Sequence, residues 1–265
     1  MKKFLVIGNP IKHSLSPKLH NYWIRQNNIK AVYESKLLGE KDLKEIIQEI
    51  KNDTLSGINV TVPFKNLVTP YLDELLPVAK KTGSVNTIFK KNNKIYGENT
   101  DAGGFQMSLE HIGFNAKGKK AFIIGAGGVA PSIIYTLKKM GIAEIALSNR
   151  TRSKSDNLKK IFKDLKIIDW GNSLKSDLII NATSLGLNEN DEIKIDFETK
   201  DTDTLFYDVI YSPNQTKFLT KAKKLNNKIQ NGNMMFIYQA YLAFSIWHDL
   251  KPKIDNNVVN LLSND

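Results

Sequence analysis

The stretch KKAFIIGAGGVAPSIIYTLKKMGIAEIALSNRTRSK, residues 119–154, decides the fold of this chain. Its apolar runs at 121–124 and 142–147 are typical of buried parallel strands. Between them, apolar side chains at 133, 134, 137 and 140 recur at helical spacing, and Gly141 is placed to end that helix. A strand, a glycine-rich turn, a helix and a second strand form the unit in which a glycine fingerprint binds a dinucleotide.

The glycine-rich turn reads GAGGVA, residues 125–130. Gly125 permits a tight turn, and Gly127 has no side chain to keep a pyrophosphate away from the backbone. Ala130 stands where a third glycine is usual, and its methyl group is small enough for the helix to pack on the strand. The N–H groups at the helix start would face the phosphates. The residues predicted to contact the cofactor here are Gly125, Ala126, Gly127, Gly128 and Val129. The alternative is a tight structural turn without a ligand.

The segment after the second strand predicts which dinucleotide is bound. An NAD site usually has an acidic residue about 20 residues past the glycines. Here residues 148–154 read SNRTRSK, without a carboxylate. Arg150 could stack on the adenine and bond a 2′-phosphate in a fork, and Lys154 could act as a point charge. We therefore predict NADP, held by Asn149, Arg150, Thr151 and Lys154; a solvated basic loop is the alternative.

Composition excludes several classes of protein. The chain has 265 residues, enough for one large or two medium domains, and no cysteine, so it has neither a disulfide framework nor a thiolate metal site. Its four histidines are scattered, and we expect no bound metal. Because no apolar stretch is long enough to span a membrane and the start reads as a strand, we expect a soluble cytoplasmic protein with no membrane partner.

The formal net charge of +11 could suggest nucleic acid. The lysines are spread along the chain, however, and no basic run is interleaved with aromatic residues. We therefore expect no nucleic-acid binding. A positive field would help to collect an anionic cofactor and an anionic small-molecule substrate.

The first hundred residues alternate between strand and helix patterns, which implies a mostly parallel sheet. Strands are predicted at 4–8, 31–37, 57–62, 85–89 and 94–97, and helices at 16–26, 42–51 and 103–112. Ser16 is expected to be the N-cap of the first helix, with Pro17 at its first position. After Phe64 we expect a helical region broken by Pro70 and Pro77.

The rest of the chain predicts a second domain. Strands are expected at 167–168, 177–181, 204–209 and 228–230, and helices at 216–225 and 234–250. The predicted fold class is α/β with two domains. Residues 1–101, completed by about 236–265, form a mostly parallel α/β substrate domain to which the C-terminal helix returns. Residues 102–235 form a Rossmann-type NADP-binding domain, and a ligand cleft is expected between the two.

Polar residues just past the strands of the first domain are the candidates for chemistry. They occur in the segments HSLSP, NVTVPFK, SVNT and ENTDAGGF, and they are Ser14, Ser16, Thr61, Lys65, Asn86, Thr87, Asn99, Thr100 and Asp101. Together they could bind a small polyhydroxylated carboxylate. Singly, each has a structural alternative: Ser16 or Asp101 as a helix cap, Asn86 in a turn, and Lys65 as a surface lysine.

Taken together, these segments resemble the shikimate dehydrogenase family. The motifs NPIKHSLSP, GINVTVPFK, GSVNT, ENTDAGGF, GAGGVA, NRT, NATSLGL, DVIYSPNQT and NGNMMFIYQA occur in the family's order, from residue 4 to about 245. The resemblance implies NADPH-dependent reduction of 3-dehydroshikimate to shikimate, in aromatic amino-acid biosynthesis.

The resemblance also implies roles for individual residues. Lys65 matches the catalytic lysine and Asp101 its partner carboxylate, which also lies at the substrate. The other substrate contacts that it implies are Ser14 and Ser16 at the carboxylate, Thr61, Asn86 and Gln239 at the ring hydroxyls, and Tyr211. Further cofactor contacts that it implies are Thr183, Val209, Gly232 and Met235. Two positions depart from the pattern: Pro77 replaces an acidic residue of some relatives, and Arg152 is either an extra phosphate contact or merely exposed.

The implied reaction needs a proton donor at the carbonyl oxygen that receives charge, and a base in reverse. A lysine can do both, and Lys65 and Asp101 would titrate as a coupled pair. Two other functions stay open. A quinate/shikimate dehydrogenase would accept quinate and NAD, against which the basic segment at 150–154 argues. A non-catalytic dinucleotide-binding regulator would be expected to lack the lysine or the aspartate. Monomer and homodimer are both compatible with the sequence.

Overall fold

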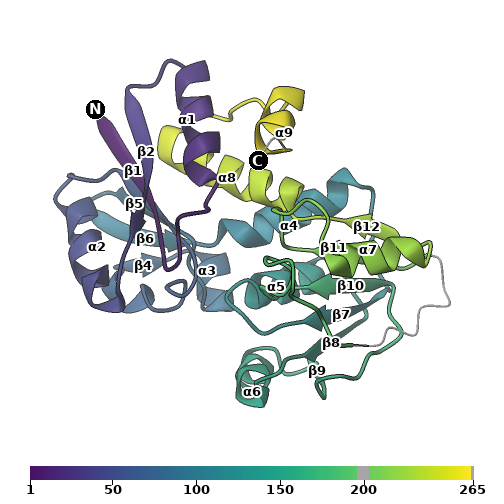
Figure 1. Ribbon diagram of the computed structural model, residues 1–265. Helices are drawn as coiled ribbons and strands as arrows, with labels where there is room; N and C mark the ends of the chain where they lie inside the picture. The colour runs from purple at the N-terminus through teal and green to yellow at the C-terminus, as the bar shows by residue number, and fades with distance from the viewer. Residues whose placement is uncertain (196–202, 264–265) are drawn as a thin grey trace. The chain divides into compact units, whose positions relative to one another are not determined.

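The structure is a computed structural model that describes residues 1–195 and 203–263. It divides into two compact units (Figure 1). The first comprises Met1–Gly104 together with the chain from Ile237 onward, and the second lies within Phe105–Phe236.

The first unit contains a six-stranded sheet of order β2-β1-β3-β5-β6-β4. Its strands are β1 (Lys2–Gly8), β2 (Ala31–Leu37), β3 (Gly57–Val60), β4 (Glu74–Leu75), β5 (Thr87–Lys91) and β6 (Lys94–Glu98). β1 pairs in parallel with β2 and β3, and β4 with β6, whereas β3–β5 and β5–β6 are antiparallel. The antiparallel hairpin turns at Asn92 and Asn93, both with positive φ, as a tight two-residue turn requires.

Alternation along β1 gives this sheet two apolar faces. Leu5 and Ile7 pack with the buried face of α2 (Leu43–Lys51), which carries Ile46 and Ile50. Phe4 instead contacts Trp247 of α8 (Asn233–His248), at 4.9 Å between ring centroids. The Trp247 indole donates to the carbonyl of Ile88 at 3.1 Å, so the C-terminal part of α8 is joined to the sheet. The sheet is therefore covered on both faces.

The remaining helices of this unit correct two predictions. They are α1 (Ser16–Gln26), η1 (Glu40–Asp42), η2 (Thr69–Tyr71), α3 (Pro77–Thr82), the start of α4 (Thr100–His111) and α9 (Asn256–Ser263). Ser16 is not an N-cap: Leu15 holds that position, no side chain caps the helix, and Ser16 is already helical. Pro70 and Pro77 do not break a helix; they lie at the start of η2 and α3, where a missing N–H costs nothing.

The second unit has a six-stranded sheet of order β12-β11-β10-β7-β8-β9, parallel at every pairing. Its strands are β7 (Lys120–Ile124), β8 (Glu144–Ser148), β9 (Lys166–Ile168), β10 (Leu178–Asn181), β11 (Leu205–Asp208) and β12 (Lys228–Gln230). Its helices include α5 (Ala130–Lys139), α6 (Arg152–Ile161) and α7 (Lys217–Lys224). This doubly wound arrangement is of the Rossmann type. The helix α6 was not predicted, whereas α9 lies in the region of about 236–265 that was expected to be helical.

Two general properties can be stated for residues 1–195 and 203–263. No helix among them is long and apolar enough to cross a membrane. In the same residues, no three or more acidic or histidine side chains are grouped so that they could hold a metal ion.

Candidate functional site

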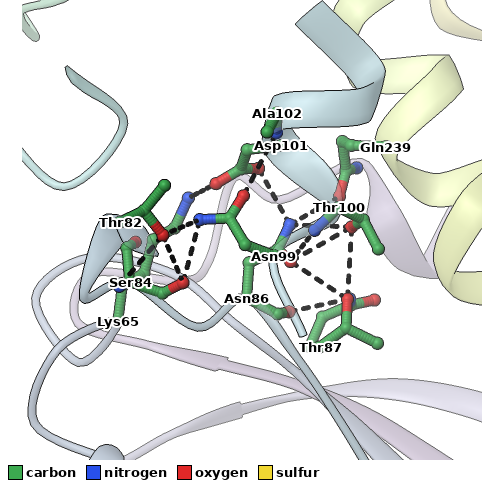
Figure 2. Close-up of polar contacts among 11 residues, drawn as sticks. Lys65, Thr82, Ser84, Asn86, Thr87, Asn99, Thr100, Asp101, Ala102 and Gln239 are labelled. Atoms are coloured by element: carbon green, nitrogen blue, oxygen red, sulfur yellow. Dashed lines mark hydrogen bonds and ion pairs between the residues drawn. The ribbon is translucent and has the colours of Figure 1, made fainter. Parts of the chain in front are cut away.

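The first unit brings Lys65 and Asp101 together (Figure 2). Lys65 lies in the turns that follow β3, where its carbonyl accepts a hydrogen bond from the N–H of Val85 at 2.7 Å. Asp101 lies in the first turn of α4. The Lys65 Nζ is 2.5 Å from the Asp101 Oδ2, and the two side chains are 12% and 8% exposed. Both members of this ammonium–carboxylate pair are thus nearly buried, whereas most lysine side chains in proteins are exposed.

Asp101 is free for this pair because another residue caps its helix. The Asn99 Oδ1 accepts from the N–H of Ala102 at 3.1 Å, which is the N-cap geometry. The Asn99 amide also donates to the carbonyl of Ser84 at 2.8 Å. The structural alternative of Asp101 as a cap therefore does not hold.

Asn86 connects the ion pair to the buried end of the sheet (Figure 2). Its Nδ2 donates to the Asp101 Oδ1 at 2.9 Å and lies 3.5 Å from the Gln239 Oε1. Its Oδ1 accepts from the Thr100 N–H at 2.7 Å and from the Thr87 hydroxyl at 3.1 Å. Asn86 is 2% exposed and has no freedom to turn its amide. Four of the residues predicted for the substrate or for catalysis, Lys65, Asn86, Asp101 and Gln239, therefore form one cluster.

The other predicted substrate residues are placed as follows. Ser14 and Ser16 lie at the start of α1, where the Ser16 N–H donates to the Ser14 Oγ at 3.3 Å. Thr61 directly follows β3, and its N–H donates to the carbonyl of Ile7 at 2.9 Å. Tyr211 belongs to the second unit, where its ring packs on Phe236 at 4.4 Å between centroids.

The glycine turn of the second unit has the geometry that a pyrophosphate needs. Gly125 has φ +107°, and a Cβ there would meet the Thr183 Cγ2 at 2.6 Å, so a side chain is excluded. A Cβ on Gly127 would meet nothing closer than the Ala182 carbonyl oxygen at 3.7 Å, so the backbone is open on that side. Ala130 is fully buried at the start of α5. The turn therefore fits a dinucleotide phosphate at a helix N-terminus.

The predicted 2′-phosphate segment is joined to this turn. The Asn149 Oδ1 accepts from the Ala126 N–H at 3.0 Å, and its amide donates to the Thr151 carbonyl at 2.8 Å. Arg150, Thr151 and Lys154 are exposed, so their polar groups can reach a ligand. Arg152 instead pairs with Asp156 at 3.1 Å and with Asp169 at 2.7 Å. The Arg152 guanidinium is thus already paired with two carboxylates of the chain.

A buried carboxylate supports the other predicted cofactor residues. The Asp208 Oδ1 accepts from the amide of Asn181 and from the N–H of Ile210, each at 3.0 Å. The Asp208 Oδ2 accepts from the Thr216 hydroxyl at 2.6 Å. Burial raises the pKa of the Asp208 carboxyl, and these three donors oppose that shift. The Asn181 Oδ1 in turn accepts from the Thr183 hydroxyl at 2.7 Å, so this network fixes Thr183.

Gly232 and Met235 complete the set of predicted cofactor residues. A Cβ on Gly232 would overlap the carbonyl oxygen of Val209, so only glycine fits there. Met235 is 6% exposed and packs in the core of the second unit. Val209 is half-buried at the carboxyl end of β11.

Four buried polar residues that support these clusters were not predicted. They are Tyr33, Asn59, Asn181 and Asp208, of which the first two lie in the first unit. A signal was present for three of them, because Asn59, Asn181 and Asp208 interrupt or end strands that are otherwise apolar. A polar residue in such a place must have hydrogen-bond partners.

Fold and site define a two-unit α/β protein with a Rossmann-type dinucleotide-binding unit. Residues 6–88 match the model of the shikimate dehydrogenase substrate binding domain, and residues 107–217 match that of shikimate / quinate 5-dehydrogenase. The chain is 54% identical to a shikimate dehydrogenase (NADP(+)) of Pelagibacter ubique, over 98% of each chain. It belongs to the shikimate dehydrogenase family.

Solved structures agree with this assignment. The shikimate dehydrogenase of Aquifex aeolicus is 36% identical, with a TM-score of 0.90 over 100% of this chain and 98% of that one. The enzyme of Thermus thermophilus, in complex with NADP(H) and shikimate, is 30% identical, with a TM-score of 0.89 over 99% and 98% of the two chains. The two-domain α/β fold predicted from the sequence is thus confirmed.

Proposed function

We propose that this chain catalyses the reversible NADPH-dependent reduction of 3-dehydroshikimate to shikimate, a step of aromatic amino-acid biosynthesis. The observation that carries the proposal is the nearly buried pair of Lys65 and Asp101, 2.5 Å apart, in a chain of this family. A buried ion pair contributes little net stability, because desolvation of both charges offsets their attraction. Its presence at a strand end is better explained by chemistry than by folding.

The reaction assigns a proton-transfer role to Lys65. NADPH, when bound, supplies the hydride that reduces the substrate carbonyl. The Lys65 ammonium would donate a proton to the carbonyl oxygen as charge develops there, and would accept it in the reverse direction. Asp101, fixed by the amide of Asn86, would hold the lysine in place and contact a neighbouring hydroxyl.

The other polar residues of the site would bind the substrate. Ser14 and Ser16 would donate their hydroxyl groups to its carboxylate, which lies at one end of the molecule. The ring hydroxyls would meet the side chains of Thr61, Asn86 and Gln239, with Tyr211 beside the ring. Amides and hydroxyls both donate and accept, as ring hydroxyls require.

The second unit would bind NADPH. The turn from Gly125 to Val129 would receive the pyrophosphate, since Gly127 leaves its backbone open. Asn149, Arg150, Thr151 and Lys154 would bind the 2′-phosphate, while Thr183, Val209, Gly232 and Met235 would lie along the ribose and nicotinamide. We accordingly assign the substrate to residues 1–101 together with about 236–265. Residues 264 and 265 lie outside the described part of the chain. NADPH is assigned to residues 102–235. A cytoplasmic location and a monomeric or dimeric state remain predictions from the sequence.

The test is an assay of purified protein with shikimate or quinate and with NADP or NAD, followed by the absorbance of the reduced cofactor. We expect fast reduction of NADP by shikimate, with slow reduction of NAD and little response to quinate. Comparable rates with NAD or quinate would indicate the broader-specificity alternative. Binding of NADPH without turnover of either acid would contradict the proposal.

A further inference from the structure

Tyr33 is a fully buried tyrosine of β2 whose hydroxyl group donates to the Asn59 Oδ1 at 2.7 Å. Its ring is 1% exposed and stacks on the His20 ring at 4.2 Å between centroids. Burial raises the pKa of the Tyr33 phenol well above its usual range, so the hydroxyl remains a donor.

Asn59 links Tyr33 to the beginning of β5. Its Nδ2 donates to the backbone carbonyl of Asn86 at 2.9 Å and to the hydroxyl of Thr87 at 3.1 Å. Asn59 is 6% exposed, so its amide has no water to exchange with. It lies in β3, between β1 and β5, at the centre of the sheet.

The direction of these hydrogen bonds is fixed by the backbone carbonyl of Asn86, which can only accept. The Asn59 amide nitrogen must therefore face that carbonyl, and the Asn59 Oδ1 is left to accept from the Tyr33 hydroxyl. Thr87, receiving that bond, directs its own proton to the Asn86 Oδ1 at 3.1 Å. The Asn86 nitrogen is then left to donate to Asp101, which is the orientation observed at 2.9 Å.

We propose that Tyr33 is a positioning residue of the substrate site. Through Asn59 and Asn86 it holds the Asp101–Lys65 pair in place. This inference rests on the proposed function, because that reaction gives the Asp101–Lys65 pair its role. It goes beyond it, because Tyr33 and Asn59 contact neither Lys65 nor Asp101 and act only through other side chains.

A purely structural role for Tyr33 would have a different consequence. Loss of a buried hydroxyl would then lower the free energy of unfolding and leave the kinetics of the folded enzyme unchanged. Tyr207 offers the matched control, since it is also fully buried and its hydroxyl is 2.7 Å from the Ser108 Oγ, in the second unit. Tyr207→Phe and Tyr33→Phe each remove one buried hydroxyl and keep the ring.

The experiment compares the steady-state kinetics of the parent, Tyr33→Phe and Tyr207→Phe in shikimate oxidation. We expect Tyr33→Phe to lower kcat/KM for shikimate by about tenfold, the scale of one lost hydrogen bond in a site, with both kcat and KM affected and the KM for NADP unchanged. Tyr207→Phe should keep parental kinetics. Equal kinetics of the two variants, or an equal loss for shikimate and NADP, would overturn the inference.

A second variant covers the case in which Tyr33→Phe does not fold. Asn59→Asp keeps the acceptor for Tyr33 and the size of the side chain but removes the donor to the Asn86 carbonyl and to the Thr87 hydroxyl. It should show the same selective loss toward shikimate, and parental kinetics in this variant would overturn the inference. Absence of shikimate turnover by the parent would instead refute the proposed function and, with it, this inference; the parental assay therefore separates the two failures.

Discussion

Two of the lysine–aspartate pairs, compared with each other, show how the surroundings change the same chemistry. Lys90 Nζ lies 2.7 Å from the Asp53 Oδ2, with the aspartate 76% exposed, whereas Asp101 in the other pair is 8% exposed. A pair in water is worth about 0–1 kcal/mol and is screened by salt. In a site shielded from water, an ammonium group acts more strongly on developing charge. Only the family resemblance separated the two pairs in the sequence, because burial is a property of the fold.

Arg150 and Arg152 are likewise alike in sequence and different in surroundings. Arg152 already pairs with Asp156 and Asp169. We expect Arg150→Ala to raise the KM for NADP by about tenfold or more, because a charge-assisted hydrogen bond to a phosphate is worth about 1.5–3 kcal/mol.

Arg152→Ala is the control for this prediction and should change the KM for NADP by less than a factor of about three. Steady-state kinetics at saturating shikimate measure both values. An equal increase in the two variants would contradict the assignment of the 2′-phosphate to Arg150.

Among the elements, the carboxyl ends of β10 and β11 are held together by Asp208. Asp208→Ala would leave the N–H of Ile210 and one N–H of the Asn181 amide without an acceptor, while the other Asn181 N–H keeps the carbonyl of Leu185. We expect the free energy of unfolding to fall by about 2–4 kcal/mol, the scale of two buried unsatisfied donors, and NADPH to bind more weakly because Thr183 loses its support.

Chemical denaturation and NADPH fluorescence titration test this prediction. Asp203→Ala is the matched control, since Asp203 is 93% exposed and pairs with Lys228 at 3.5 Å. If Asp208→Ala retained parental stability and NADPH affinity, the network would not support the cofactor edge.

The regular elements were largely predictable because apolar periodicity reports burial directly. The predicted strands at 31–37 and 228–230 coincide with β2 and β12, and the glycine turn lies between β7 and α5. The second predicted strand of that unit, 142–147, begins only at Glu144, because residues 142 and 143 lie in the loop between α5 and β8. The helix α6 was missed because its segment, RSKSDNLKKI, is mostly polar and only Ser155 and Leu158 are buried. Its pattern resembles that of a solvated loop.

The site was predictable only where a motif carried it. Lys65, Asn86 and Asp101 belong to segments that resemble the family, and the structure brings them into one cluster. Tyr33 was not predicted, because it is an ordinary strand residue until its partner, far along the chain, is known. Asn59 interrupts an apolar strand, which indicates a buried hydrogen bond but not its partner. The partners in a network between distant strands leave no local pattern.

For the whole molecule, acid stability depends on two histidines that pack against aromatic side chains. His20 is fully buried, and in the described part of the chain neither ring nitrogen has a hydrogen-bond partner. Burial, with a smaller contribution from His248, lowers the pKa of His20 to about 3. Burial, with Lys2 nearby, lowers the pKa of His248 to about 4. The unfolded chain, whose histidines titrate near 6.5, therefore binds more protons than the folded one below that pH.

As the pH falls from about 6.5 toward the lowered pKa of His20, we expect this residue to reduce the free energy of unfolding by up to about 1.4 kcal/mol per pH unit. The half-buried His248 should contribute less. His20→Phe should remove the larger contribution, so that its stability depends less on pH between about 6.5 and 4.5. Urea denaturation at several pH values measures this slope. His13→Phe, at an exposed position, is the control and should keep the parental slope; an unchanged slope in His20→Phe would refute the prediction.

The chemistry proposed for this molecule depends most on Lys65 as its acid–base group, and one comparison of variants tests that role directly. The rate of NADP reduction by shikimate is measured for the parent, Lys65→Ala and Lys90→Ala, together with shikimate binding to each. We predict that Lys65→Ala lowers kcat by about 10²–10⁴-fold, with a smaller effect on shikimate binding, while Lys90→Ala, from the exposed ion pair, behaves like the parent. Turnover by Lys65→Ala within a few-fold of the parent would contradict the assignment of Lys65 as the acid–base group.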